Sequence, residues 1–222
     1  MGKSGKYLAA SIILFVLFIA FTAAVCLYDV QAIGPQGSSV GLAGVNGSVA
    51  QQMPYSEMWY KITKYLGYLA ILVIVFFAAL GVMELVTKKS IGRVSNGILM
   101  LGALYVAVAV FYVLFNKIIV NYRPVQEDGA LEASYPSSHT MLAVCVFISA
   151  AVQISRGRGA AAFKKICAVV FVVLAVIMVV GRTLSGVHWF TDIVGGVLLS
   201  AALLTAYCAS LSYLSSKSPD AD

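Results

Sequence analysis

Long apolar runs dominate the chain, and short polar segments separate them. Six runs are close to or above the roughly 20 residues that a helix needs to cross a bilayer. They cover residues 8–28, 65–86, 97–115, 141–154, 166–181 and 193–214. The fourth run is the shortest, and it can extend back towards Ser137. The pattern predicts an all-α fold, a polytopic membrane bundle of six transmembrane helices.

Little of the chain lies outside these helices and their loops, so we expect a single membrane-embedded domain over residues 1–222. Residues 29–60 form the longest connection, which starts rich in glycine and serine and then has apolar positions spaced for a short surface helix. A lid over a lipid-binding cleft is the functional alternative for this loop. The polar tail, residues 215–222, is expected to be disordered.

The charge pattern orients these helices. A composition of 61% hydrophobic and 11% charged residues excludes an ordinary soluble domain and a disordered chain. Of the 15 lysines and arginines, ten fall on the side of the N-terminus, and five (Lys61, Lys64, Lys117, Arg123 and Arg182) fall on the other. Cytoplasmic loops carry such an excess, so both termini are expected in the cytoplasm. The net charge of +6 then reports topology in a multi-pass cell-membrane protein, and we expect no nucleic-acid partner.

The only two histidines lie in polar clusters of this oily sequence, and both clusters fall on the external side of the predicted topology. His139 ends the segment Pro136-Ser137-Ser138-His139, and His188 lies between Arg182 and Asp192. Imidazole transfers protons near neutral pH and can act as a nucleophile, while arginine forks match phosphate oxygens. Charged groups beside membrane helices are functional by default, because they are costly to place there. Together these residues indicate phosphate chemistry on a lipid.

The polar clusters resemble the type 2 phosphatidic acid phosphatase superfamily, integral-membrane lipid phosphatases related to vanadium haloperoxidases. That family carries K-x6-R-P, then P-S-G-H, then S-R-x5-H-x3-D. The third part matches in spacing at Arg182, His188 and Asp192, with Gly181 in place of the first serine. The second part has Ser138 in place of glycine.

The first part of the family pattern departs further. Arg123-Pro124 is present, but Lys117 is one residue too close to it, and Asn116 occupies the expected lysine position. A shift of one residue turns a helical side chain by roughly 100°. Lys117 is therefore either a phosphate ligand at an unwound helix end or a lysine that snorkels to the interface.

The resemblance implies catalytic roles. His188 would attack phosphorus and form a phosphohistidine, and Asp192 would hydrogen-bond the other nitrogen of its ring. His139 would protonate the leaving lipid oxygen and then activate water. The implied phosphate-binding residues are Arg123, Arg182, Ser137, Ser138 and Lys117. A plain helix N-cap is an equally good reading of Ser137. The scheme requires no metal and no cofactor.

An acidic stretch, Glu127, Asp128 and Glu132, follows Arg123. A solvated loop is the simpler interpretation, and the alternative is that Glu127 or Asp128 tunes Arg123. The implied function is that of a lipid phosphatase at the extracytoplasmic face, with undecaprenyl diphosphate as the best substrate and phosphatidylglycerophosphate or phosphatidic acid as competitors. A non-enzymatic lipid transporter or binding protein and a metal hydrolase remain as alternative classes. The pattern leaves the oligomeric state open.

Overall fold

The computed structural model describes residues 2–126 and 129–217 of the chain. Within these residues it forms seven α-helices, and six of them are long and apolar enough to cross a membrane. The six are α1 (Lys3–Leu27), α3 (Glu57–Lys88), α4 (Asn96–Lys117), α5 (Ser138–Arg156), α6 (Ala161–Leu184) and α7 (Phe190–Lys217). Each coincides with one of the six predicted runs, which confirms the expected all-α membrane bundle.

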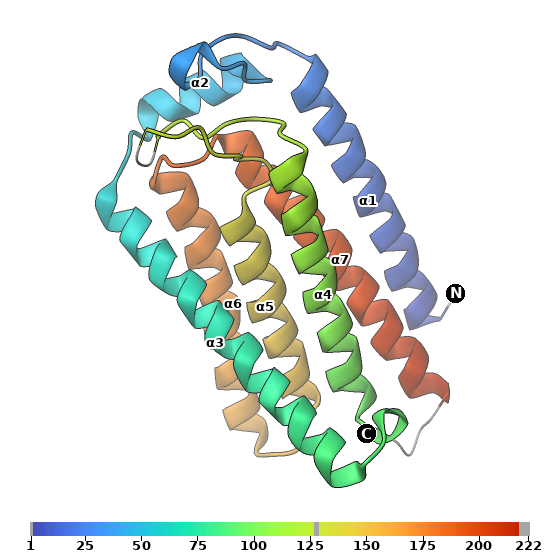
Figure 1. Ribbon diagram of the computed structural model, residues 1–222. Coiled ribbons are helices and arrows are strands. Elements are labelled where there is room, and N and C mark those ends of the chain that lie inside the picture. The colour runs from blue at the N-terminus through green and yellow to red at the C-terminus, as the bar shows by residue number, and fades with distance from the viewer. Residues whose placement is uncertain (1, 127–128, 218–222) are drawn as a thin grey trace.

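Helices α5 and α7 form the centre of the bundle (Figure 1). About half of the most apolar window of each is buried inside the protein, against 17% or less for the other four helices. Helix α1 packs along α7, α6 packs along α5, and α3 and α4 cover the remaining sides of α5. The outer helices therefore present their apolar side chains outwards, as expected for surfaces that face lipid tails.

Small residues let the two central helices approach their neighbours closely, because nothing but packing and hydrogen bonds holds helices together in lipid. Gly195 of α7 faces the ring of Tyr135, where an added Cβ would lie 2.6 Å from a ring carbon. At Gly196 an added Cβ would lie 3.1 Å from the carbonyl oxygen of Ser137. The start of α7 thus packs directly against the turn that precedes α5.

The loops divide between the two ends of the bundle. The connections 28–56, 118–126, 129–137 and 185–189 gather at the end where Figure 1 shows α2 (Ala43–Gln52). The first residues of α1 and the last residues of α7 lie together at the opposite end, where the Ser4 hydroxyl donates to the Ala209 carbonyl. Two short turns also lie outside the α-helices, η1 (Pro35–Gly37) and η2 (Ile91–Arg93).

The C-terminal end of the chain modifies the sequence-based picture in detail. Helix α7 continues to Lys217, so residues 215–217 of the segment expected to be disordered are helical instead. Their helix hydrogen bonds continue those of α7, and the Arg156 side chain donates to Ser215 Oγ at 2.7 Å. The remainder of that tail lies outside the described residues.

The long connection, residues 29–60, contains α2 and is anchored to the start of α7. The amide of Asn46 donates to the Gly41 carbonyl and to Thr191 Oγ1, and its oxygen accepts from the Thr191 backbone N–H. Asn46 is fully buried by these contacts. The buried amide of Asn46 has its hydrogen bonds satisfied, so its role is structural: it holds α2 over the 185–189 loop.

Candidate active site

Asp192 occupies the third position of α7 and caps that helix. Its Oδ2 accepts from the backbone N–H of Trp189, at 2.9 Å, just before the helix begins. This is the half of a capping box in which the N3 side chain reaches back to the N-cap amide. The carboxylate therefore lies at the positive end of the helix dipole, where negative charge is stabilised. Asp192 is fully buried, and its role as a helix cap is enough to explain its position.

Two further side chains donate to the Asp192 carboxylate. Asn121 Nδ2 lies 3.1 Å from Oδ1, and the hydroxyl of Ser134 lies 2.5 Å from Oδ2. Both side chains are buried. A buried carboxylate is costly unless hydrogen bonds compensate it, and this one accepts three.

A short antiparallel pairing of two loop segments places those donors. The Ser134 N–H donates to the Asn121 carbonyl, and the Arg123 N–H donates to the Glu132 carbonyl. Tyr122 and Ala133 form the bridge between these bonds. Asn121 and Ser134 therefore form one cross-strand pair, and Arg123 and Glu132 form the next. Because alternate residues of paired strands point the same way, the side chains of both pairs lie on the same side.

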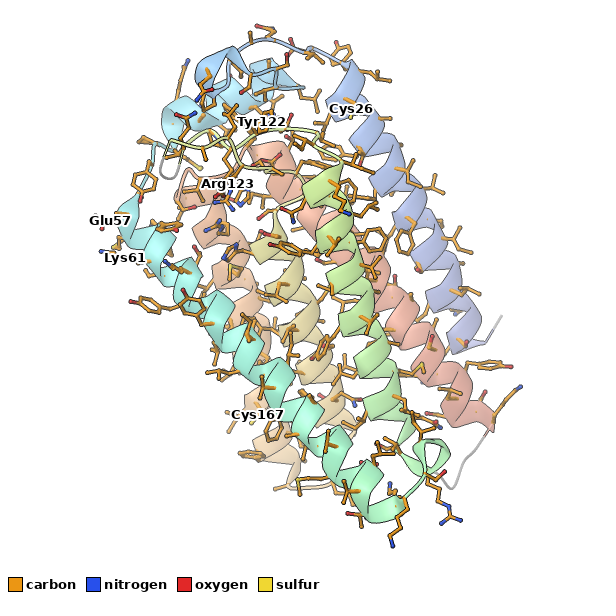
Figure 2. All side chains as sticks on the ribbon, in the orientation of Figure 1. Cys26, Glu57, Lys61, Tyr122, Arg123 and Cys167 are labelled. Atoms are coloured by element: carbon orange, nitrogen blue, oxygen red, sulfur yellow. The ribbon has the colours of Figure 1, made fainter. Side chains whose placement is uncertain are left out.

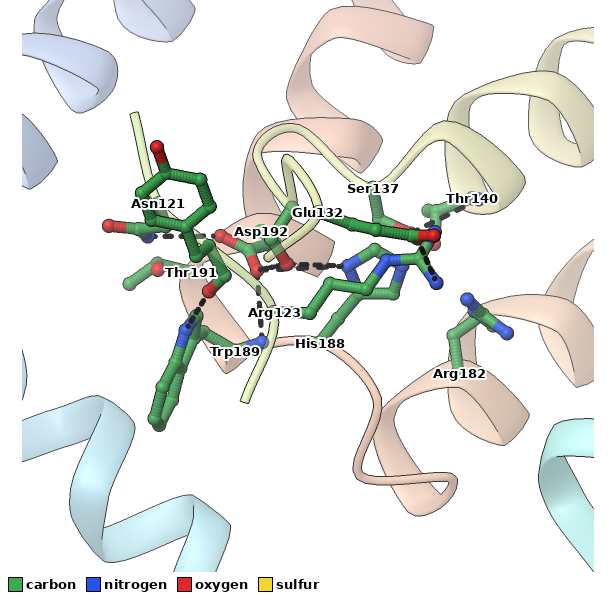
Figure 3. A network of polar contacts seen from close by, with 12 residues as sticks. Asn121, Arg123, Glu132, Ser137, Thr140, Arg182, His188, Trp189, Thr191 and Asp192 are labelled. Carbon is green, nitrogen blue, oxygen red and sulfur yellow. Dashed lines mark hydrogen bonds and ion pairs between the residues drawn. The ribbon is translucent and has the colours of Figure 1, made fainter. Parts of the chain in front are cut away.

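His188 connects to Asp192 through Ser134. The Nδ1 atom of His188 lies 2.9 Å from Ser134 Oγ and 3.7 Å from Asp192 Oδ2. Because the single proton of the Ser134 hydroxyl goes to Asp192, Ser134 Oγ accepts from the imidazole. The direct Asp192–His188 hydrogen bond implied by the family resemblance is therefore replaced by a hydroxyl bridge. Figure 3 shows this polar network beside both arginines.

The other ring nitrogen of His188, Nε2, is buried and has no hydrogen-bond partner in the part of the chain that the structure describes. Burial lowers the pKa of His188 well below its usual value, and electrostatic repulsion from the neighbouring Arg182, Arg123 and His139 lowers it further. The ring is thus held neutral with its proton on Nδ1. That leaves a lone pair on Nε2, which is the form that a nucleophile needs.

Arg182 comes from the last turn of α6 and is fully buried. Its Nη1 lies 3.3 Å from Thr63 Oγ1 of α3, and its Cζ lies 5.9 Å from the centroid of the Tyr60 ring. Gly181 explains how the helices come this close: a Cβ there would lie 2.8 Å from Thr63 Cγ2. The departure from the family's serine at position 181 thus fits the tight packing of α6 on α3.

Arg123 approaches the network from the opposite segment, at the end of the bundle where Figure 2 labels it. Its Nη1 lies 3.1 Å from Glu132 Oε2. The side chain of Arg123 is 14% exposed and that of Glu132 is 44% exposed. Glu132 is thus one carboxylate that orients Arg123. Glu127 and Asp128, for which that role was considered, lie outside the described residues.

His139 lies in the first turn of α5 and lines a cavity of about 860 Å³ between α3, α4 and α5. The cavity has one polar end, lined by Lys64, Arg123, Glu132, Ser138 and His139. Its other end is lined by apolar and aromatic side chains that include Ile71, Ile74, Val108, Phe111 and Leu142. The Nδ1 atom of His139 is buried and unbonded among the described residues. Such a cavity suits a ligand with a charged head and an apolar tail.

The two serines before His139 have different positions. Ser137 is buried as the N-cap of α5, where its Oγ accepts from the Thr140 N–H at 3.4 Å and from the Thr140 hydroxyl at 3.0 Å. Ser138 is the first residue of α5 and lines the cavity. The helix-cap interpretation of Ser137 therefore describes its contacts, while Ser138 stands at the helix N-terminus that faces the cavity. Helix N-termini favour anions such as phosphate.

Lys117 is not part of this arrangement. It is exposed at the end of α4 and does not line the cavity, whereas Asn116 does. Helix α4 stays regular up to Lys117, so the one-residue shift from the family pattern is not absorbed by an unwound helix end. Lys117 is therefore outside the cavity, as a one-residue turn of a helical side chain by roughly 100° would produce. Contact between Lys117 and phosphate stays a prediction.

The structure thus brings together His188, Asp192, Arg123, Arg182 and His139, and it adds residues that sequence reasoning did not select. Ser134 and Asn121 bond the buried carboxylate, and Lys64 lines the cavity. Asn121 stands two residues before Arg123, and Ser134 stands three residues before Ser137, so both lie beside selected positions. Lys64 carried no signal, because nothing in its local sequence separates it from Lys61. Among the described residues, no group of three or more His, Cys, Asp or Glu side chains could hold a metal ion.

Comparison with known proteins gives two findings. The model of the PAP2 superfamily matches residues 99–215. The chain is also similar in fold to the crystal structure of a transmembrane PAP2-type phosphatidylglycerolphosphate phosphatase from Bacillus subtilis, with a TM-score of 0.63 and 19% sequence identity over 94% of this chain and 96% of the other. No curated protein sequence matches significantly. The matched region contains both histidines, both site arginines (Arg123 and Arg182) and Asp192.

Proposed function

The chain belongs to the PAP2 superfamily, and on that premise we propose that it is a membrane lipid phosphatase that works through a phosphohistidine at His188. The observation that carries the proposal is the state of the His188 ring. Its Nδ1 is tied to Asp192 through Ser134, and its Nε2 has no partner among the described residues. A neutral imidazole with one hydrogen-bonded nitrogen and one unbonded nitrogen can act as a nucleophile towards phosphorus.

In the first step, His188 Nε2 attacks the terminal phosphorus of the lipid. The N–P bond forms while the P–O bond to the lipid breaks, and the electron pair of that bond goes to the leaving oxygen. His139 donates a proton to this oxygen. The positive charge that develops on the His188 ring is stabilised by Ser134 and Asp192, because Nδ1–H donates to a hydroxyl that itself donates to a carboxylate.

In the second step, His139 removes a proton from water, and the resulting nucleophile attacks the phosphohistidine. The N–P bond breaks, its electron pair returns to Nε2, and inorganic phosphate leaves. His139 ends protonated and His188 ends neutral, so the cycle closes. Arg123 and Arg182 carry the non-bridging oxygens in both steps, since positioning and charge stabilisation dominate phosphoryl transfer.

The cavity supports the proposal of a lipid substrate. The head group would occupy the polar end beside His139 and Arg123, and the tail would follow the apolar lining between α3 and α4. We propose undecaprenyl diphosphate as the substrate, with phosphatidylglycerophosphate or phosphatidic acid as the competing choice. The first would make the protein a recycler of a cell-wall carrier lipid.

We place this chemistry at the extracytoplasmic face of the cell membrane. The support is the charge distribution: ten of the 15 basic residues flank the end of the bundle opposite α2, and cytoplasmic ends carry such an excess. We further propose that hydrolysis needs no metal ion, because Arg123 and Arg182 supply the positive charge that a metal would provide. Activity that EDTA abolishes and added metal restores would favour a metal hydrolase instead.

The decisive experiment measures phosphate release by the purified protein in detergent, across a panel of isoprenoid and glycerolipid phosphates. His188→Ala and His139→Ala should each lower kcat by at least about 100-fold, as expected when a nucleophile or a general acid is removed. Wild-type protein quenched in alkaline detergent after reaction with ³²P-labelled substrate should carry a label that acid releases, and the His188→Ala variant should carry none.

The same experiment separates the alternative classes. A lipid transporter or binding protein would bind these lipids and release no phosphate, and both histidine variants would bind unchanged. A preference for glycerolipid phosphates by a large margin in kcat/KM would overturn undecaprenyl diphosphate as the substrate while leaving the phosphatase itself in place. Lys217→Ala, at the far end of α7, serves as a matched control that should behave as wild type.

A further inference from the structure

Lys64 is a lysine of α3 that lines the polar end of the cavity. It is half-buried, whereas Lys61, one turn earlier, is exposed and pairs with Glu57 at 2.6 Å. In the part of the chain that the structure describes, no carboxylate pairs with Lys64. A lysine held at a cavity in a membrane helix without such a counter-charge keeps its charge for a ligand.

Two contacts place Lys64 within the site. Its Nζ lies 5.8 Å from the centroid of the Tyr60 ring, and the Cζ of Arg182 lies 5.9 Å from the same centroid. One turn further along α3, a Cβ on Gly67 would lie only 3.2 Å from Cδ2 of His139. Lys64 and Arg182 thus share the Tyr60 ring as a neighbour, and Lys64 lies on the helix face that touches His139.

The cavity also distinguishes the two histidines. Lys64 and His139 both line it, and His188 does not. In the proposed reaction, His188 meets the terminal phosphorus and His139 meets the oxygen that leaves with the lipid. Lys64 therefore lies on the leaving-group side of the reacting phosphorus, in the direction of the apolar lining.

We propose that Lys64 binds the proximal phosphate of a lipid diphosphate and favours diphosphates over monophosphates. This inference rests on the proposed function, because it uses the same attack at His188. When the P–O bond to the bridging oxygen of a diphosphate breaks, the electron pair stays on the departing lipid monophosphate, which gains negative charge next to Lys64. A lipid monophosphate instead releases an alcohol protonated by His139, and it offers Lys64 no second phosphate.

The test compares two substrates with the same tail, farnesyl diphosphate and farnesyl monophosphate, in detergent micelles. Lys64→Met should lower kcat/KM for the diphosphate by at least about 10-fold, since removing one donor to a developing charge in such a site costs that much or more. For the monophosphate the loss should stay below about 3-fold. Lys64→Arg should keep most of the preference for the diphosphate.

Lys61→Met is the matched control, because it removes a lysine from the same helix that pairs with Glu57 and lies outside the cavity. It should leave both substrates unchanged. The ratio of the two kcat/KM values on one preparation cancels any loss of folded protein. Lys117→Met tests the sequence-based alternative: a selective loss there, without one at Lys64, would overturn the assignment.

The remaining outcomes also decide between the two proposals. Equal losses on both substrates in Lys64→Met, or no loss on either, would overturn the role of Lys64 while wild-type activity upholds the phosphatase. If the wild-type protein hydrolyses only the monophosphate, the role of Lys64 is likewise overturned and the phosphatase is upheld. Wild-type protein that releases no phosphate from either substrate or from glycerolipid phosphates would overturn the proposed function itself, and the assignment with it.

Discussion

Ser134 Oγ lies 2.9 Å from His188 Nδ1, closer to that ring than the carboxylate of Asp192, whose Oδ2 is 3.7 Å away. The hydroxyl accepts from the imidazole and donates to Asp192 in turn. A single loop residue thereby transmits the carboxylate's charge to the ring that we propose as the nucleophile. It also fixes which nitrogen of the ring carries the proton.

Ser134→Ala should lower kcat by about 10- to 100-fold with little change in KM, because the charge on the phosphorylated ring loses its bridge to Asp192. Ser134→Thr keeps a hydroxyl and should recover much of the rate. Steady-state kinetics over pH 5–9 would test this, since the acid limb of kcat should shift in the alanine variant and return in the threonine variant. A rate loss that threonine does not relieve would indicate a packing role for Ser134.

The low pKa of His188 makes the folding stability pH-dependent in a defined direction. Both the folded and the unfolded forms carry a neutral ring above the unfolded pKa of about 6.5. As the pH falls below that value, the unfolded chain takes up a proton and the folded chain does not, so stability falls by about 1.4 kcal/mol per pH unit until the depressed folded pKa of His188 is reached.

Thermal unfolding in detergent between pH 7.5 and pH 5 provides the measurement. The wild-type Tm should drop as the solution is acidified, and His188→Gln should drop less steeply because its side chain does not titrate. Parallel Tm curves for the two proteins would mean that His188 is protonated in the folded state, and the neutral-nucleophile assignment would then be wrong.

Gly67→Ala should impair activity without preventing folding. The added methyl group would lie 3.2 Å from Cδ2 and 3.6 Å from Nε2 of His139, so the imidazole must shift by a few tenths of an ångström. Displacement of a general acid on that scale is expected to cost about 10-fold in kcat. Gly102→Ala in α4 is the control, because nothing lies within 4 Å of its added Cβ. Equal activity of both variants would show that His139 tolerates the shift.

Asn46→Ala should destabilise the protein by about 1–3 kcal/mol, because the substitution leaves a buried carbonyl and the Thr191 N–H without their partner. Thr191 is next to Asp192, so kcat should fall as well. Thermal unfolding and turnover of Asn46→Ala are compared with Ser48→Ala, an exposed position on the same helix. An unchanged Tm in Asn46→Ala would show that the contact between α2 and α7 does not stabilise the protein.

The hydrophobic pattern along the chain was sufficient to predict the six membrane helices, including the extension of α5 back to Ser138. The spacing Arg182, His188, Asp192 likewise identified a buried cluster. Local sequence could not identify the hydroxyl bridge at Ser134. That contact depends on the pairing of residues 121–123 with 132–134, which brings together parts of the chain that no periodicity links.

The sequence by itself determined the class of the protein, its spans and the polar residues that cluster beside them, because a membrane admits few ways to satisfy a backbone and makes every charge costly. Only the tertiary structure decided which of those charges share one cavity. Lys117 has the expected residue type near the expected place but does not line the cavity, while Lys64 lines it from a helix that no motif marks. The physical reason is that a helix presents a side chain by its angle around the axis, and which angle faces the site is set by the helices packed against it.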